Sequence, residues 1–332
     1  MDSRSAHTKL AIGSSLAETM SHKGKILVTP RSVTREGHSS LERLSLAGHD
    51  VILGPRGRQP SEEELIQLLP SCIGYIAGIE PITRRVLEAA VNLRAISRNG
   101  TGVDSIDAAA ARERNIVILR AEGANARGVA ELTIGFLFAL ARGLTACDAS
   151  LKAGGWVRPN GVELEGRTLG IIGCGRIGKT VAELAVGIGL RVIAYDALPD
   201  YNFSAGAAFK FAPMREVLEH SEFLSLHCPP TANGHALIGE SEFAQLRHGA
   251  FIINTARYQL FDPEALLAAL DSGRITGAAL DVFDSEPPRD PRLALHPRVL
   301  ATPHIGGLTR ESVGRAMDAA VDNLIRELAV SR

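Results

Sequence analysis

The chain has 332 residues, of which 45% are apolar and 22% are charged, so its composition is that of a folded globular protein rather than a disordered one. Its length predicts two domains. Its formal net charge is -1, so no overall field favours nucleic acid or an anionic membrane surface as a partner. An anionic substrate therefore needs a local cationic site.

The N-terminal segment is rich in Ser, Ala and His and has no clean apolar stretch of the kind found in signal peptides. We interpret residues 1–23 as a mobile tail and expect a cytoplasmic protein. The most apolar run, residues 132–141, is too short to cross a bilayer. The cysteines are Cys72, Cys147, Cys174 and Cys228. None of them forms a CxxC pair, which favours free thiols and no metal site.

Short β-branched runs alternate with segments of helical spacing over the first third of the chain. The predicted strands are residues 25–29, 50–53, 74–77, 93–97 and 115–119. Helices are predicted between them, for example over 62–69 and 81–90. Apolar strands that alternate with helices are typical of a doubly wound parallel sheet.

A longer α/β array follows. Its predicted strands are residues 168–173, 191–195, 223–226, 250–254, 277–281 and 299–301. Asp262 predicts a helix N-cap, Pro263 its first turn and Gly273 its end. The segment 129–142 is apolar nearly all round, which predicts a helix buried on all sides, between the two sheets or against a second subunit. Residues 309–328 predict a terminal amphipathic helix.

The strongest local motif is 169–178, LGIIGCGRIG, which follows an apolar strand and opens a helix. In that context GxGxxG is typical of a dinucleotide-binding turn. Gly173 permits the tight turn, Gly175 lets backbone amides approach a pyrophosphate, and Gly178 lets helix and strand pack closely. Asp196 ends the next predicted strand, where a carboxylate binds a ribose 2′-hydroxyl and repels a 2′-phosphate. The motif therefore favours NAD over NADP.

Three polar residues of the second array, Arg257, Glu286 and His304, each follow a predicted strand. Because ligands bind at the carboxyl ends of parallel strands, we interpret them as a catalytic group. Histidine suits proton transfer near neutral pH, and arginine suits a substrate carboxylate. Each has a simpler reading when taken alone. His304 could cap a turn, Glu286 could be a solvated loop acid, and Arg257 could pair with a surface carboxylate.

Several stretches join this pattern. They are 99–104 (NGTGVD), 129–133 (VAELT), 169–178, 254–257 (NTAR), 280–286 (LDVFDSE) and 302–306 (TPHIG). With these motifs, residues 25–330 resemble the D-isomer-specific 2-hydroxyacid dehydrogenases, most closely the branch that acts on D-3-phosphoglycerate. The resemblance implies an NAD-dependent oxidoreductase that transfers a hydride between a D-2-hydroxy acid and its 2-keto acid.

The resemblance also implies roles for individual residues. His304 would protonate the keto oxygen, with Glu286 favouring its imidazolium form. Arg257 would bind the substrate carboxylate and polarise the carbonyl, together with the backbone of Thr101 and Gly102. The implied cofactor contacts are Arg176 and Ile177 under the pyrophosphate, Cys228 near the adenosine, Thr255 and Ala256 near the nicotinamide, Asp281 at the carboxamide, the loop residues Gly306 and Gly307, and Thr101.

We therefore predict an α/β protein with two doubly wound parallel-sheet domains and a cleft between them. A flavodoxin-like substrate domain would span residues 1–118, and a Rossmann NAD domain would span 119–303. Residues 304–332 would return to the substrate domain as its last helix. The apolar helix 129–142, together with the resemblance, favours a homodimer.

The substrate side chain is the point at which the sequence departs from the phosphoglycerate branch. Arg98 matches one arginine that would hold a phosphate, but the loop from Ala77 to Glu80 lacks the second. Glu80 would repel a phosphate if it pointed inward. Arg31 could substitute or be an exposed loop cation. The chain ends at residue 332, and we expect no C-terminal regulatory domain.

Three functional hypotheses follow. The first is oxidation of D-3-phosphoglycerate with NAD, or the reverse reaction. The second is reduction of hydroxypyruvate, glyoxylate or another 2-keto acid. The third, from another class, is an NAD-sensing scaffold that recruits protein partners without turnover, which the lack of long disordered tails disfavours. No nucleic-acid or membrane partner is predicted.

Overall fold

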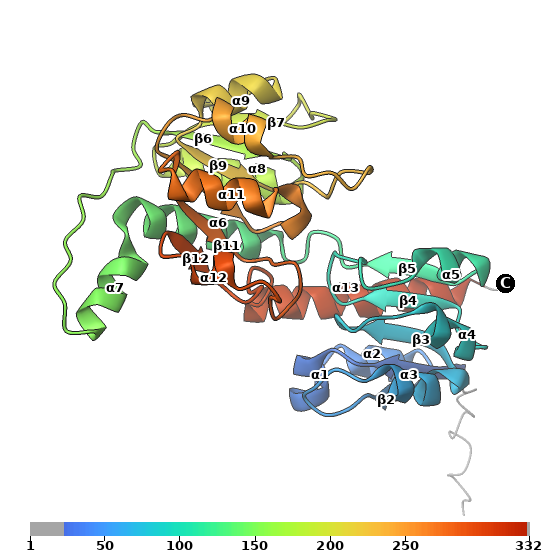
Figure 1. The fold of residues 1–332 in the computed structure, drawn as a ribbon. Coiled ribbons are helices and arrows are strands. Elements are labelled where there is room, and N and C mark those ends of the chain that lie inside the picture. Colours follow the sequence, from blue (N-terminus) through green and yellow to red (C-terminus); the bar gives the residue numbers. More distant parts are fainter. Residues whose placement is uncertain (1–22, 331–332) are drawn as a thin grey trace, which may run out of the picture. The chain divides into compact units, whose positions relative to one another are not determined.

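The computed structural model describes residues 23–330, so the tail expected over 1–23 lies outside the described part, except for Lys23. Two parallel sheets form the cores of two compact units (Figure 1). Unit 1 contains the described residues up to Arg98, Val103–Leu119 and the chain from Val321. Unit 2 contains Asn99–Gly102 and Arg120–Ala320. The predicted α/β class with two parallel sheets is confirmed.

The sheet of unit 1 has five strands in the order β2-β1-β3-β4-β5. They are β1 Gly24–Val28, β2 His49–Leu53, β3 Cys72–Ala77, β4 Ala95–Arg98 and β5 Val117–Arg120. Strand β1 pairs in parallel with β2 on one side and with β3 on the other. This is the flavodoxin-like order, and it has a topological switch point between β1 and β3.

The helices of unit 1 are short amphipathic segments, three of which have side-chain caps. They are α1 Arg31–Glu36, α2 Leu41–Leu46, α3 Glu62–Leu68, α4 Arg84–Ala89 and α5 Ala108–Glu113, with a 3-10 turn η1 Leu69–Ser71. Ser61 accepts a hydrogen bond from Glu64 N at 3.2 Å and so caps α3. Helices α3, α4 and α5 bury Leu65, Val86 and Ala110 in one core with strands β3 and β4.

The sheet of unit 2 has seven strands in the order β12-β11-β10-β9-β6-β7-β8. They are β6 Thr168–Ile172, β7 Arg191–Tyr195, β8 Phe209–Phe211, β9 Phe223–Leu226, β10 Ala250–Asn254, β11 Ile275–Leu280 and β12 Val299–Ala301. The chain adds β7 and β8 on one side of β6 and β9 to β12 on the other. The switch point therefore lies between β6 and β9, which is the Rossmann arrangement.

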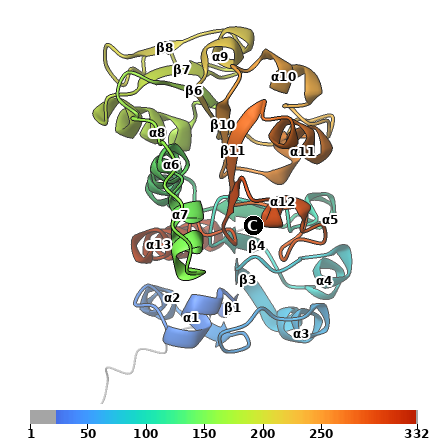
Figure 2. The same cartoon turned by 60° about the vertical axis from the view of Figure 1, so that its left-hand side comes forward.

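Helices pack on both faces of this sheet. The helices of unit 2 before β12 are α6 Ala126–Arg142, α7 Leu144–Lys152, α8 Arg176–Gly187, α9 Met214–His220, α10 Glu240–Gln245, α11 Pro263–Asp271 and α12 Arg292–Leu295, with a 3-10 turn η2 Tyr258–Leu260. In Figure 2, α6 and α8 lie on one side of the sheet and α10 and α11 on the other. Each side has its own core, one around Phe136 and Val181 and the other around Phe243 and Leu266. Asp262 Oδ1 caps α11 by accepting from Glu264 N at 2.9 Å, as predicted.

The prediction that segment 129–142 is buried on all sides is wrong for the single chain. Helix α6 buries one face, which includes Phe136 and Leu137, whereas Phe138 is 44% exposed. The next helix, α7, has no buried residue at all. Within residues 23–330, no single helix has the length and apolar composition of a membrane span, although α6 and α7 pass that test as a pair bent by 65°.

The terminal helix α13, Arg310–Ala329, matches the predicted amphipathic helix closely. Its residues from Val321 onward belong to unit 1. There Asp322 pairs with Arg43 of α2 at 2.8 Å, and the carbonyl of Val330 accepts from Arg94 at 2.7 Å. Leu324 is fully buried and packs against Gly74 of β3.

Candidate active site

The glycine-rich loop joins β6 to α8 in the way a dinucleotide turn requires. Gly173 has φ 91°, and a Cβ atom there would lie 2.5 Å from the backbone nitrogen of Cys228. A Cβ atom on Gly178 would collide with the carbonyl oxygen of Gly173. At Gly175, by contrast, a Cβ atom would meet nothing within 4 Å. The N-terminus of α8, which begins at Arg176, is therefore open to an anionic group.

Asp196 follows β7 and lies beside this loop. Its Oδ2 accepts from the backbone N–H of Cys174 at 2.7 Å, and its Oδ1 accepts from Leu198 N at 2.9 Å. Two backbone donors thus fix the carboxylate beside the glycine loop. Lys179 pairs with a second acid, Asp200, at 2.6 Å, and this hydrogen bond lowers the pKa of Asp200. Lys179 is therefore engaged in an ion pair with Asp200.

The other cofactor candidates of this loop show mixed surroundings. The side chain of Arg176 pairs with Glu122 at 3.2 Å, and both side chains are well exposed. Ile177 packs partly buried against the core between the sheet and α6.

Burial raises the pKa of Cys228 to about 11, and burial together with the Asp196 charge raises that of Cys174 to about 12. Both thiols are therefore protonated at neutral pH and are not nucleophiles.

Arg257 follows β10 in a loop that a buried asparagine orders. Asn254, which is fully buried, accepts from Ala256 N at 3.0 Å and donates to the carbonyl of Arg257 at 2.8 Å. The guanidinium of Arg257 donates to the carbonyl of Ala256 at 2.7 Å. Sequence reasoning missed Asn254, although an amide at the end of an apolar strand was a signal that could have identified it.

Thr255 is joined to α6. The hydroxyl of Thr133 donates to the carbonyl of Val129 at 2.9 Å, so it has no second proton to give. The 3.2 Å contact between the two threonine hydroxyls therefore has Thr255 as the donor. This bond joins the end of β10 to the buried face of α6. Thr133 is a second residue that sequence reasoning missed.

His304 and Glu286 form a direct pair. Nδ1 of His304 lies 2.6 Å from Oε1 of Glu286, and the two side chains are 45% and 42% exposed. An ionised carboxylate only accepts, so Nδ1 carries the proton and donates. The other ring nitrogen, Nε2, takes no part in that bond. His304 has φ 53°, a left-handed conformation that is rare for residues other than glycine.

Asp281, at the end of β11, holds the loop that carries His304. The aspartate is 1% exposed. Its Oδ1 accepts from Thr302 Oγ1 at 2.5 Å and from Ile305 N at 2.8 Å, and its Oδ2 accepts from Gly306 N at 2.8 Å. Thus three donors flanking His304 converge on one buried carboxylate. Asp281 therefore fixes the backbone of this loop, a role that sequence reasoning did not foresee.

The topology brings three of these loops together. Strands β10, β11 and β12 are neighbours in the sheet, and their carboxyl ends carry Arg257, Glu286 and His304 in that order. Gly307 lies beside Asn125 at the start of α6, where a Cβ atom would lie 3.2 Å from the amide nitrogen. Among the predicted substrate residues, Thr101 and Gly102 belong to unit 2, whereas Arg98 ends β4 of unit 1.

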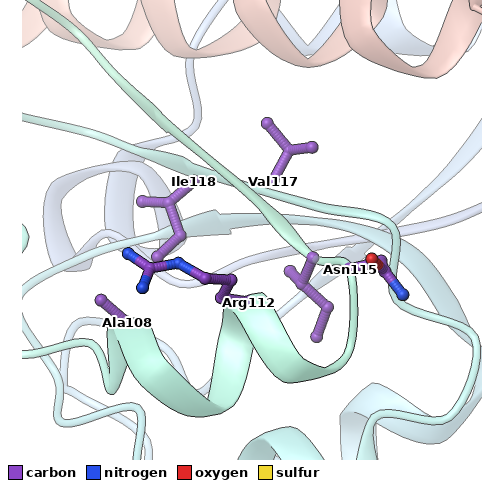
Figure 3. A pocket seen from close by; sticks show the side chains of 6 residues that line it. Ala108, Arg112, Asn115, Val117 and Ile118 are labelled. Carbon is purple, nitrogen blue, oxygen red and sulfur yellow. The ribbon is translucent and has the colours of Figure 1, made fainter.

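A surface pocket of unit 1 lies elsewhere. It has a volume of about 400 Å³ and lies between α5 and β5 (Figure 3). Its lining residues are Ala108, Arg112, Asn115, Ile116, Val117 and Ile118. None of them belongs to the predicted site, and the pocket is at the sheet edge rather than at the carboxyl ends of the strands. It therefore takes no part in the site described above.

Comparisons with known proteins give the same picture. The sequence profile of the D-isomer specific 2-hydroxyacid dehydrogenase, NAD binding domain, matches residues 134–306. The chain is 40% identical to human D-3-phosphoglycerate dehydrogenase over 258 residues, which cover 77% of this chain and 48% of that one. It is 37% identical to the hydroxypyruvate reductase of Thermotoga maritima over 276 residues, which cover 81% and 89%.

Among solved structures, the NAD⁺-bound 3-phosphoglycerate dehydrogenase of Entamoeba histolytica superposes with a TM-score of 0.76 at 29% identity, covering 91% of this chain and 94% of that one. The chain spans about half the length of the first curated relatives that it matches. The family profile covers more than half of the chain, and the reductase is matched over most of its length. The chain therefore belongs to the D-isomer specific 2-hydroxyacid dehydrogenase family, and residues 134–306 match the NAD binding domain of that family.

Proposed function

We propose that this protein interconverts a D-2-hydroxy acid and its 2-keto acid with NAD. The observation that carries the proposal is the 2.6 Å pair between His304 and Glu286, on a loop that the buried Asp281 holds in place. A histidine whose Nδ1 is committed to a carboxylate presents Nε2 for proton transfer. The neighbouring strand end supplies a guanidinium for an anionic substrate.

In the direction of reduction, Nε2 of His304 gives its proton to the keto oxygen, while a hydride is added to the carbon. The product is the 2-hydroxy acid, and Glu286 stabilises the imidazolium before the proton leaves. Arg257 binds the substrate carboxylate and polarises the carbonyl. The backbone N–H groups of Thr101 and Gly102 share that carboxylate. Bound NADH supplies the hydride.

The described residues fit NAD. Open space at Gly175 and the free N-terminus of α8 suit the pyrophosphate, with Arg176 and Ile177 beneath it. The fixed carboxylate of Asp196 suits the ribose hydroxyls and disfavours NADP. We assign the remaining contacts as the family pattern implies. They are Cys228 near the adenosine, Thr255 and Ala256 near the nicotinamide, Asp281 at its carboxamide, and further cofactor contacts from Thr101 and from Gly306 and Gly307 in the loop after the histidine.

Two substrates compete. The 40% identity to a phosphoglycerate dehydrogenase and the presence of Arg98 favour D-3-phosphoglycerate. The carboxylate of Glu80, in the loop where a second phosphate-binding arginine was expected, favours hydroxypyruvate or glyoxylate. The relative from Thermotoga maritima that is named a hydroxypyruvate reductase is matched over 89% of its length, which supports the second candidate.

We also propose a homodimer. The apolar residues left uncovered on α6, α7 and the segment after them are Phe138, Leu144, Leu151, Trp156 and Val157. Trp156 is 77% exposed, although tryptophan is large and usually well covered. A second copy of the chain would cover this surface. Sedimentation of the wild type against Trp156→Ser tests the assignment, because the variant should shift toward the monomer.

The test of the function is oxidation of NADH with 3-phosphohydroxypyruvate, hydroxypyruvate and glyoxylate in parallel. His304→Ala is the inactive variant, and His248→Ala, at an exposed position between α10 and β10 of the same unit, is the matched control. Turnover of at least one keto acid that depends on His304 but not on His248 supports the proposal. Equal turnover by His304→Ala and the wild type contradicts it.

A further inference from the structure

A buried carboxylate lies at the switch point of the unit 1 sheet. Glu80 follows β3 and is 1% exposed. Its Oε1 accepts from the hydroxyl of Tyr75 at 2.6 Å, from Gly78 N at 2.9 Å and from the hydroxyl of Thr29. Thr29 directly follows β1, and the N–H of Thr29 donates to Ile76 O at 3.1 Å. The carboxylate is therefore placed where β1 and β3 end side by side, which is where ligands bind in such sheets.

The second oxygen of this carboxylate is not used within the described part of the chain. Oε2 of Glu80 is buried and has no hydrogen-bond partner there. It faces Gly78, where a Cβ atom would lie 2.5 Å away. Only glycine fits at that position while Glu80 is in place. A buried carboxylate with a spare acceptor is costly unless a positive charge compensates it.

Arg98 supplies that positive charge. It ends β4, is 8% exposed, pairs in register with Ala77 of β3, and donates to the Ala77 carbonyl at 3.5 Å. The charges of Glu80 and Arg98 both affect the pKa of Tyr75. Burial raises the pKa of Tyr75 well above its ordinary value, and the charge of Glu80 raises it further, whereas the charge of Arg98 acts in the opposite direction. Both charges therefore act on the same hydroxyl.

The consequence for a ligand is electrostatic. A lone arginine at this edge would attract a phosphate, whose two negative charges suit a bidentate cation. With Glu80 beside it, the cluster of Thr29, Tyr75, Glu80 and Arg98 has no net positive charge. A phosphate brought to this edge would also meet a carboxylate in a region of low dielectric, where repulsion is strong.

We propose that Glu80 is a specificity-determining residue that excludes phosphorylated substrates and selects unphosphorylated 2-keto acids such as hydroxypyruvate and glyoxylate. This inference rests on the proposed function, because it assigns the substrate class of the proposed reaction. At this edge the charge of Glu80 then offsets that of Arg98, the arginine that resembles a phosphate ligand.

The variant that tests the inference is Glu80→Gln, which keeps an acceptor for Tyr75 and Gly78 but removes the charge. Glu88→Gln, on the exposed side of α4, is the matched control. The readout is the ratio of kcat/KM for 3-phosphohydroxypyruvate to kcat/KM for hydroxypyruvate. We expect the wild type to prefer hydroxypyruvate at least tenfold, and Glu80→Gln to raise the ratio at least tenfold. Glu88→Gln should leave it unchanged.

A preference of the wild type for the phosphorylated substrate overturns the inference without any variant, so misfolding of Glu80→Gln cannot hide a failure. An unchanged ratio in a folded Glu80→Gln protein overturns it as well, while His304-dependent turnover would leave the proposed function intact. If the wild type turns over none of the substrates, the proposed function fails. In that case, calorimetry with inorganic phosphate decides. Tighter phosphate binding by Glu80→Gln than by the wild type supports the inference, and equal binding overturns it.

Discussion

Oε1 of Glu286 lies 2.6 Å from Nδ1 of His304, although the two residues come from different loops, one after β11 and one after β12. Because both side chains are nearly half exposed, the pair adds little to the stability of the fold. Its value lies in orientation: the carboxylate fixes the tautomer and the ring plane of the histidine. The backbone of the same loop is fixed separately, by the buried Asp281.

Removing the charge of Glu286 should lower activity without unfolding the protein. In Glu286→Gln, the amide oxygen still accepts from Nδ1, but the imidazolium that forms during the reaction loses its counter-charge. We expect kcat to fall about 10- to 100-fold, less than the roughly 10²- to 10⁴-fold that a proton-transfer group itself contributes. Steady-state kinetics with a saturating keto acid measure the effect. Asp284→Asn, an exposed neighbour in the same loop, is the matched control and should stay near wild type.

Asp281→Asn tests the brace under His304. An amide presents one N–H₂ group toward donors that now share a carboxylate, so at least one of Thr302 Oγ1, Ile305 N and Gly306 N loses its acceptor. We expect a loss of about 1–3 kcal/mol in the free energy of unfolding, measured by denaturant titration. Thr302→Val removes a single donor and should cost less. A stable Asp281→Asn protein with wild-type kcat would contradict this role.

Asp196 should set the choice between NADH and NADPH. In Asp196→Ser, the carboxylate that Cys174 N and Leu198 N now fix is gone, so a 2′-phosphate is no longer repelled. We expect the ratio of kcat/KM for NADPH to that for NADH to rise at least tenfold. Asp200→Ser removes a nearby acid that pairs with Lys179 and is the comparison variant. The assignment fails if the two variants shift the ratio equally.

His227 should make the fold sensitive to acid. Burial lowers its pKa to about 3, so the folded protein holds it neutral, with Nε2 2.8 Å from the hydroxyl of Ser225. Because the folded-state pKa lies below the unfolded value, its contribution is fully present above pH of about 6.5 and is lost as the pH falls toward 3. The loss is at most about 1.4 kcal/mol per pH unit.

Denaturant titrations at pH 7 and pH 5 measure this dependence. His227→Gln should have a smaller loss of stability between the two values than the wild type. His235→Gln, which alters an exposed histidine, should behave as the wild type does. Parallel curves for all three proteins would show that His227 does not carry the effect.

The sequence predicts most of the fold because its signals are local. Alternation of short apolar strands with capped helices gives the two sheets, and the glycine spacing from Gly173 to Gly178 marks the turn that the structure contains. Strand β8 was missed, because the three residues Phe209–Phe211 at the sheet edge are too few to show a period. Helix α6 was predicted as buried all round, since composition does not reveal which face lacks a partner within one chain.

Part of the candidate site could be predicted from the sequence, and part of it could not. Arg257, Glu286 and His304 were predicted from their places after strands, and the topology puts those strands side by side. Their roles, and those assigned to the cofactor residues, stay predictions. What the sequence could not give is the set of contacts that depend on three-dimensional closure. Asn254 bonding to the Arg257 loop, Asp281 under His304, and Glu80 against Tyr75 join residues whose neighbours are set by packing rather than by spacing.

In the proposed reaction, His304 transfers the proton that accompanies the hydride. The most direct measurement compares His304→Gln with the wild type in two assays, the Kd for NADH and kcat/KM for the preferred keto acid. We predict an unchanged Kd, because the glycine loop and Asp196 are untouched, and a fall in kcat/KM of about 10² to 10⁴. A variant that keeps wild-type turnover, or that loses NADH binding and turnover in equal measure, would contradict the account.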